Sequence, residues 1–146
     1  MGRAETKIIE LTDQDLVAMF GGEPNTVRLE QGEVLFKNGD PSACMYVVRN
    51  GILTIRSGRV VYEDVGPGGI IGEMGIVQTG APRTAMVYAR AQSELVQIDE
   101  QRFLALVEET PSFALYVMRV LARRLHRMDV RYEANRDDPA DPNILI

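Results

Sequence analysis

The chain between Asn25 and Ile98 alternates short β-like runs with turn residues, and this pattern constrains the fold more than any other feature. Seven runs rich in valine, isoleucine and tyrosine follow one another: TVRL, EVLFK, CMYVV, ILTIR, RVVYEDV, TAMVYA and ELVQI. The Asn50-Gly51 and Ser57-Gly58 pairs between them are typical of tight hairpins. Short strands with turns about every 8–12 residues predict a β-sandwich, a jelly roll or a small barrel over residues 25–98.

Helical patterns flank this β region on both sides. Thr12 can cap a helix at about 12–20, because Asp15 follows three residues later in the spacing of a capping box. After the last run, Asp99 can cap a helix at about 100–108, and Thr110-Pro111 can begin another at about 111–133. The sequence therefore predicts a mainly β, α+β domain over residues 1–134, followed by an irregular tail at 135–146.

Composition narrows the classes of function. A formal net charge of −5 argues against a general nucleic-acid binder, which needs a basic face. The single cysteine, Cys44, lies in an apolar run and predicts a buried thiol, and it excludes an intramolecular disulfide. The single histidine, His126, has no neighbours that complete a metal site or a catalytic pair. No apolar run is long enough to cross a bilayer. We expect a cytoplasmic protein that neither holds a metal nor inserts into a membrane.

The longest insertion between the β-like runs is Gly66–Val87, which holds six of the 13 glycines, one carboxylate at Glu73 and one arginine at Arg83. Glycine lets backbone N–H groups turn toward an anion, and an arginine fork pairs with phosphate. A cyclic phosphate ester of a nucleoside fits this set, with Arg83 on the phosphate and Glu73 on the ribose hydroxyl. The further candidates are a helical turn at Gly72-Glu73-Met74-Gly75, the hydroxyl of Thr84, the amides of Thr84 and Ala85, and apolar walls at Val61, Ile70 and Ile71.

Simpler interpretations of the same residues remain open. Arg83 follows a proline at a strand start, where arginines are usually surface residues. Glu73 can cap a turn or pair with Arg83, and a glycine cluster is more often a turn than an anion site. The order of these residues along the chain carries more information than any of them alone.

The segment GGIIGEMGIVQTGAPRTAMVYA resembles the phosphate-binding cassette of the cyclic nucleotide-binding domain family. The resemblance extends to the earlier run LEQGEVLFKNGDPSACMYVVRNG and to the ARRL stretch of the last helix. It implies an eight-stranded jelly-roll barrel with a short N-terminal helix and two C-terminal helices. It also implies that Glu73 binds the ribose 2′-hydroxyl and Arg83 the cyclic phosphate, with Gly72, Met74, Gly75, Thr84 and Ala85 completing the site.

In this family the last helix forms a lid over the base. The resemblance implies that the lid residues are Arg124, Arg127, Met128 and Arg131. The catabolite activator branch places a Thr-Ser pair against adenine, and the matching positions here are Met128-Asp129. The sequence therefore leaves the choice between cAMP and cGMP open.

The last helix also carries a heptad pattern, formed by Ala114, Met118, Leu121, Leu125, Met128 and Tyr132. This pattern predicts a homodimer through the helix. The alternative is one wide apolar face that is buried within the monomer.

Three hypotheses about function follow. The first is a regulatory module that binds cAMP or cGMP, needs no other cofactor, and signals to an unknown downstream protein by moving its last helix. The second is a ligand-free member of the fold that serves as an interaction scaffold. The third is an enzyme, ranked last because Glu73 and Arg83 supply neither a metal cluster nor an activated water. Only Glu133–Ile146 follow Tyr132, too few residues for the helix-turn-helix domain of the activator branch, so direct DNA binding is not expected.

Overall fold

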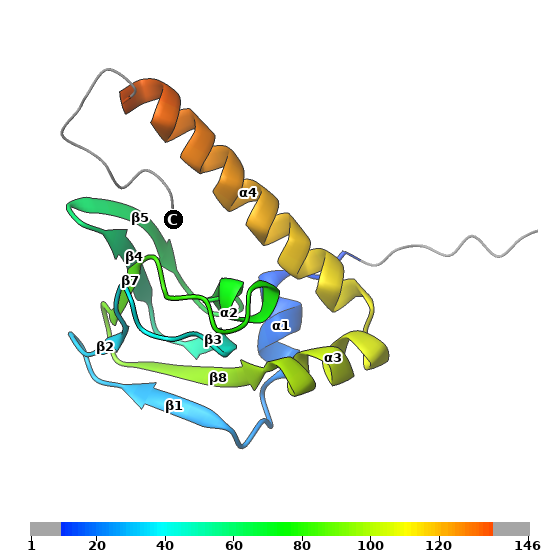
Figure 1. Ribbon diagram of the computed structural model, residues 1–146. Coiled ribbons are helices and arrows are strands. Elements are labelled where there is room, and N and C mark those ends of the chain that lie inside the picture. Colours follow the sequence, from blue (N-terminus) through cyan, green and yellow to red (C-terminus); the bar gives the residue numbers. More distant parts are fainter. Residues whose placement is uncertain (1–9, 136–146) are drawn as a thin grey trace, which may run out of the picture.

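The computed structural model describes residues 10–135, with side chains for residues 10–127. Two four-stranded antiparallel sheets form the body, and four helices accompany them (Figure 1). The elements, in chain order, are α1 (Asp13–Met19), β1 (Thr26–Leu29), β2 (Val34–Phe36), β3 (Cys44–Asn50), β4 (Leu53–Ser57), β5 (Val60–Val65), β6 (Ile70–Ile71), α2 (Met74–Val77), β7 (Met86–Ala89), β8 (Ser93–Asp99), α3 (Glu100–Glu109) and α4 (Ser112–Asn135).

The strand order confirms the predicted jelly roll. One sheet has the order β1-β8-β3-β6 and the other β2-β7-β4-β5, so strands distant in sequence are neighbours in both sheets. Side-chain alternation along β3 divides the core in two. Met45 and Val47 face the helices, where they pack with Phe113, whereas Tyr46 and Val48 face the second sheet.

The helix ends use the caps that the sequence indicated. Thr12 and Asp15 form a reciprocal capping box at the start of α1. The Asp99 side chain accepts a hydrogen bond from the Arg102 amide at the start of α3. At the other end of α1, the Arg49 guanidinium donates to the carbonyls of Phe20, Gly21 and Glu23, which fixes α1 against β3.

One of the two predicted hairpins is correct and the other is wrong. Ser57-Gly58 joins β4 and β5, which pair directly. Asn50-Gly51 instead carries the chain from β3 in one sheet to β4 in the other. Gly51 has φ +96°, and a Cβ there would lie 2.1 Å from the Ser93 hydroxyl oxygen. This close crossing between sheets therefore requires glycine. An Asn-Gly pair in the sequence looks the same whether it forms a hairpin or such a crossing.

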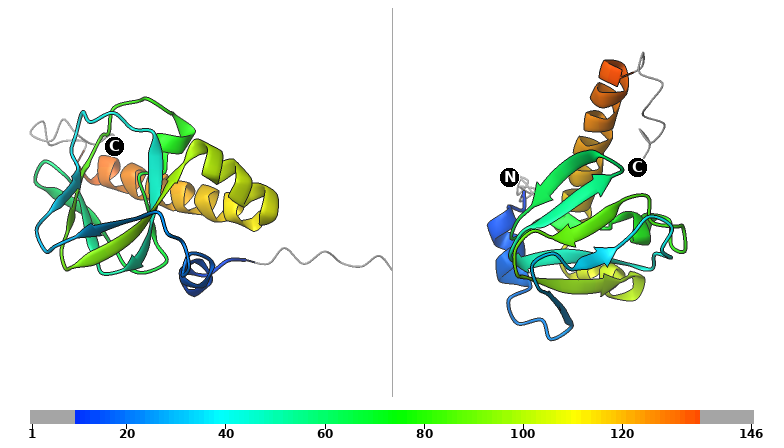
Figure 2. Two further views of the ribbon diagram at one scale, coloured as in Figure 1. Left: turned by 90° about the horizontal axis from the view of Figure 1, so that it is seen from below. Right: turned by 90° about the vertical axis from the view of Figure 1, so that its left-hand side faces the viewer.

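The last helix reaches across the molecule. Its first half packs beside α1 and α3, and its C-terminal half rises past the β4–β5 hairpin, away from the body (Figures 1 and 2). Tyr116 anchors the first half, because its hydroxyl lies 2.8 Å from both Asp13 Oδ1 and the Gly68 carbonyl oxygen. Among the helices of the described residues, none is both long and apolar enough to cross a membrane. The predicted tail at 135–146 lies almost wholly outside the described residues.

Candidate functional site

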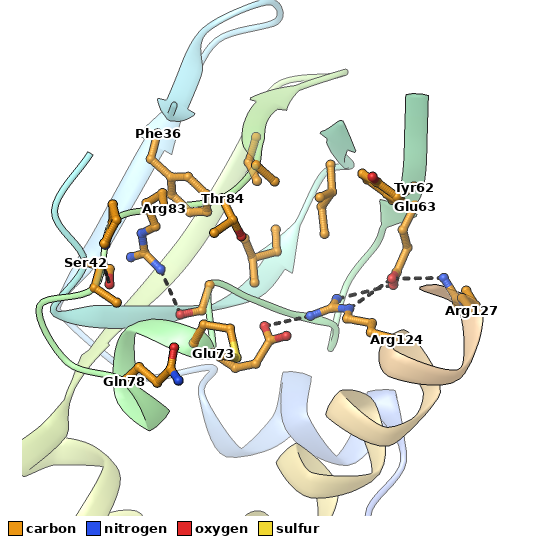
Figure 3. Close-up of a pocket in the computed structure, with 18 residues that line it drawn as sticks. Phe36, Ser42, Tyr62, Glu63, Glu73, Gln78, Arg83, Thr84, Arg124 and Arg127 are labelled. Atoms are coloured by element: carbon orange, nitrogen blue, oxygen red, sulfur yellow. Dashed lines mark hydrogen bonds and ion pairs between the residues drawn. The ribbon is translucent and has the colours of Figure 1, made fainter. Parts of the chain in front are cut away.

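A cavity beside the second sheet, next to α2 and α4, gathers most of the predicted site residues (Figure 3). The strands β2, β4, β5, β6 and β7 form its walls together with the 72–85 loop, and α4 contributes two arginines. Its lining consists of Phe36, Ser42, Ile55, Tyr62, Glu63, Ile71, Gly72, Glu73, Met74, Gln78, Ala81, Pro82, Arg83, Thr84, Ala85, Val87, Arg124 and Arg127.

Arg83 is buried and firmly held, which rules out the simpler interpretation as a surface residue. Its Nη1 donates to the Gly72 carbonyl at 2.9 Å, and its Nη2 donates to the Cys44 carbonyl at 2.8 Å. The guanidinium carbon lies 4.2 Å from the centroid of the Phe36 ring. The prediction of a buried Cys44 is also confirmed, since this residue is 9% exposed.

Two glycines make room for this arginine. A Cβ at Gly72, where φ is +72°, would lie 2.7 Å from Arg83 Nη1. A Cβ at Gly75 would lie 2.4 Å from the Cys44 carbonyl oxygen and 3.0 Å from Arg83 Nη1. Arg83 can therefore occupy this position only because both of these neighbouring residues are glycines.

Arg83 carries a buried positive charge that no carboxylate of the described residues neutralises. Among residues 10–127, none of the ion pairs includes Arg83. Its Nε is the one buried side-chain nitrogen or oxygen atom of the described residues without a hydrogen-bond partner. Burying an unpaired cation is costly, so the arrangement is suited to an anion that arrives from outside the chain.

Glu73 lies near the middle of the cavity wall and pairs with α4, not with Arg83. Its Oε2 accepts a hydrogen bond from Arg124 Nη1 at 2.7 Å, and its side chain is 7% exposed. Arg124 also donates from Nε to Glu63 at 3.0 Å and from Nη2 to the Ile70 carbonyl at 2.8 Å. Burial by itself lowers the pKa of Arg124, but the Glu73 and Glu63 carboxylates outweigh burial and raise it.

The other residues of the predicted loop surround Arg83. Thr84 and Ala85 line the cavity just before β7, and their amides donate to no backbone carbonyl among the described residues. Met74 begins α2 and lines the cavity, as the predicted helical turn required. Gly75 lies behind the wall, beneath Arg83.

Two predicted wall residues lie elsewhere. Val61 is half exposed on β5, and Ile70 points into the core between the first sheet and the helices. A register shift between β4 and β5 at Ile55/Arg56 changes which β5 side chains face inward, so Tyr62 and Glu63 line the cavity instead. Ile71, as predicted, is in the wall. The side chains of Met128 and Arg131 lie outside the described residues.

Sequence reasoning missed Glu63, Tyr62 and Phe36 as cavity residues. Phe36 belongs to β2, well before the loop in sequence, whereas Tyr62 and Glu63 belong to β5, directly before it. Both segments have the patterns of ordinary strands. The nearest signal in the sequence was the alternation of side chains along RVVYEDV. Because of the register shift, this alternation does not indicate which side chains face the cavity.

The fold and the cavity define a jelly-roll domain with a cavity beside one sheet, lined by Arg83 and Glu73. The family model for the cyclic nucleotide-binding domain matches residues 26–110, more than half of the chain. The chain therefore belongs to the cyclic nucleotide-binding domain family.

Individual relatives agree with this assignment. The lysophospholipase nte1 of Neurospora crassa is 32% identical over 104 residues, which cover 68% of this chain and 7% of that protein. The cyclic AMP receptor protein of Thermus thermophilus is 29% identical over 108 residues, which cover 70% of this chain and 50% of that protein. A solved structure from a cyclic-GMP-dependent signalling pathway of bacterial phytopathogenesis superposes with a TM-score of 0.67 at 25% identity, covering 80% of this chain and 96% of that one. The chain thus spans only half or less of these two sequence relatives.

Proposed function

We propose that this chain is a cytoplasmic regulatory module that binds a 3′,5′-cyclic mononucleotide, cAMP or cGMP, in the cavity beside α2. Arg83 holds the cyclic phosphate, and Thr84 and Ala85 add a hydroxyl and backbone amides. Glu73 accepts the ribose 2′-hydroxyl. Gly72, Met74 and Gly75 shape this part of the site.

The observation that carries the proposal is the unpaired charge of Arg83. Arg83 is 8% exposed, and its guanidinium is oriented by two carbonyl groups and has no carboxylate partner among the described residues. A phosphodiester carries one negative charge, and a charge-assisted contact to arginine contributes about 1.5–3 kcal/mol. A ligand-free scaffold has no use for a cation placed in this way, which weighs against the second hypothesis.

Signalling proceeds through α4 in this proposal. Arg124 and Arg127 bring α4 to the cavity, and Arg124 contacts the same carboxylate that receives the ribose. Binding therefore changes the environment of α4 directly, and a change in the position of the helix is the output to a downstream protein. Met118 and Leu125 remain about 60% exposed on α4, and we place a homodimer contact there. The chain acts by binding, without hydrolysing the nucleotide, inserting into a membrane or contacting nucleic acid directly.

Calorimetric titration with cAMP and with cGMP tests the proposal. Wild type should bind at least one nucleotide with micromolar affinity or better. Arg83→Ala should weaken that binding by one to two decades, because about 1.4 kcal/mol corresponds to a factor of ten. Arg90→Ala is the matched control, since Arg90 is exposed and pairs with Asp64 away from the cavity.

Two results would contradict the proposal. One is the absence of heat with either nucleotide from a folded wild-type chain. The other is an equal affinity of wild type and Arg83→Ala. Recovery of the nucleotide unchanged after incubation tests the non-catalytic part of the proposal separately.

A further inference from the structure

The end of the cavity away from Arg83 is charged, which is unusual for a surface that meets a flat base. In Figure 3, Glu73 lies between Arg83 on one side and the group of Tyr62, Glu63 and Arg127 on the other. With the phosphate on Arg83 and the ribose on Glu73, the base reaches this second group. The inference below therefore rests on the proposed function.

Glu63 is held in place but keeps hydrogen-bonding capacity. Its Oε1 accepts from Arg124 Nε at 3.0 Å and from Arg127 Nη1 at 3.0 Å. Within the described residues, its Oε2 accepts a single longer bond, of 3.3 Å, from Arg124 Nη2. An ionised carboxylate offers about four acceptor positions, so Oε2 can take another donor. The Arg124 bonds fix the carboxylate at the cavity wall.

Arg127 is the more exposed of the two arginines. Its side chain is 47% exposed, against 14% for Arg124, and the only ion pair it forms within the described residues is the one with Glu63. An ion pair this exposed contributes little to stability, so Arg127 can exchange it for a base at small cost. The cavity thus presents a fixed acceptor and an adjustable planar donor.

We infer that Glu63 and Arg127 read guanine, and that the ligand of this chain is cGMP. Guanine places two donors, N1–H and the 2-amino group, on one edge, and a carboxylate can accept both. Its O6 and N7 are acceptors that an arginine fork contacts in the geometry common in protein–nucleic acid recognition. The Tyr62 ring, which lines the same end, supplies aromatic surface.

Adenine does not complement this pair. Its 6-amino group is a donor where guanine has the O6 acceptor, so it meets the donors of Arg127. Its N1 is an acceptor where guanine has N1–H, so it faces the carboxylate of Glu63 with like polarity. Leaving such groups unpaired in a partly buried site discriminates strongly between ligands.

The test compares cGMP, cIMP and cAMP by calorimetry on the wild-type chain. Cyclic IMP keeps N1–H and O6 but lacks the 2-amino group, so it isolates one of the contacts without any mutation. We expect cGMP to bind at least tenfold more tightly than cAMP, with cIMP between them. A cAMP affinity equal to or above that of cGMP would overturn the inference and leave the proposed function standing, whereas failure of all three nucleotides would remove both.

Glu63→Gln distinguishes base reading from a purely structural role. The glutamine amide keeps the shape but offers one acceptor and one donor group, so cGMP affinity should fall about tenfold while cAMP affinity changes less than about threefold. If Glu63 only positioned Arg124, both affinities would fall equally, and that result would overturn the inference. Asp64→Asn is the control, because it makes the same charge change one residue along β5, where the side chain bonds Thr54 and does not line the cavity.

Discussion

Arg124 Nη1 donates to Glu73 Oε2 at 2.7 Å, and this hydrogen bond joins the last helix to the carboxylate that we propose for the ribose. Both side chains are largely buried, at 14% and 7% exposed. Glu73 stands at the start of α2 with no side-chain cap of its own, so its carboxylate is directed away from the α2 backbone. One carboxylate thus both lines the cavity and bonds α4.

Replacing Arg124 with methionine should destabilise the chain markedly. The substitution leaves the buried Glu73 carboxylate without its partner, and removing one member of a buried pair costs about 3 kcal/mol or more. Urea denaturation should show this loss in the free energy of unfolding. Arg123→Met, an exposed neighbour on α4, should change it by less than about 0.5 kcal/mol.

A double-variant cycle identifies the cause. Glu73→Gln combined with Arg124→Met removes both charges, so it should recover a large part of the stability that Arg124→Met loses. If the two substitutions simply added, the ion pair would not be the reason for the loss.

Gly75→Ala should destabilise the chain although Gly75 lies in a helix. In an unconstrained helix this change is favourable by about 1 kcal/mol. Here the new Cβ would lie 2.4 Å from the Cys44 carbonyl oxygen, a backbone atom that cannot move aside cheaply. We expect a loss of about 1–3 kcal/mol, as in other overpacked sites, and about a tenfold weaker nucleotide affinity because Arg83 is displaced.

Gly22→Ala provides the comparison. A Cβ at Gly22 meets no atom within 4 Å, so this substitution should be neutral within about 1 kcal/mol and should leave nucleotide affinity unchanged. Thermal melting and calorimetry measure both quantities. Equal behaviour of the two alanine variants would contradict the steric argument.

The sequence predicted those parts of the molecule that local rules determine. The caps at Thr12 and Asp99 and the turn at Ser57-Gly58 each depend on residues a few positions away in the sequence. The candidate residues Gly72, Glu73 and Arg83 likewise belong to one short segment. Strand lengths and turn spacing limited the fold to a sandwich, a jelly roll or a small barrel, and the family resemblance selected the jelly roll.

Features that depend on strand register, or on contacts between segments distant in the sequence, were not predictable. Asn50-Gly51 has the composition of a hairpin turn, but it crosses between sheets, and Gly51 is required there because Ser93 of β8 lies against it. Glu63 enters the cavity through a register shift against β4. β6 has only two residues, too few for any periodicity, and it exists because β3 offers an edge for Ile70 and Ile71. The partner of Glu73 comes from α4, 51 residues away.

Glu94→Gln should make the free energy of unfolding depend less on pH in the acid range. The hydrogen bond from Arg49 lowers the pKa of Glu94 below its usual 4.5, although burial opposes the shift. A carboxyl whose folded pKa is depressed stabilises the chain above its unfolded pKa, and this contribution is lost as pH falls through the folded value. Wild type should therefore be more stable than the variant at pH 7, and the difference should shrink below about pH 4.

Urea denaturation between pH 7 and pH 3 measures this difference. Glu109→Gln is the control, because Glu109 is exposed and belongs to none of the ion pairs of the described residues. Its effect should stay nearly constant over the same range. If the difference in the free energy of unfolding between wild type and Glu94→Gln did not depend on pH, the charge of Glu94 beside Arg49 would not contribute to stability.

Charge introduced on the exposed face of α4 should separate the proposed dimer. Met118 and Leu125 are seven residues apart, so they lie on one face of α4, and both are about 60% exposed. Val117 and Val120 are buried against the body, which leaves Met118 and Leu125 as a second apolar face. Burying such a face in a dimer is favourable, and paired glutamates there would repel each other and remain desolvated.

Light scattering at high protein concentration should give a dimer for wild type and a monomer for Met118→Glu/Leu125→Glu. The double variant should keep its cyclic nucleotide affinity within about threefold, because neither side chain lines the cavity. Arg119→Glu/Arg123→Glu, which alters exposed charge on the same helix without touching Met118 or Leu125, should reduce dimerisation less. If wild type stayed a monomer at high concentration, with and without nucleotide, the apolar face of Met118 and Leu125 would serve a different partner, or none.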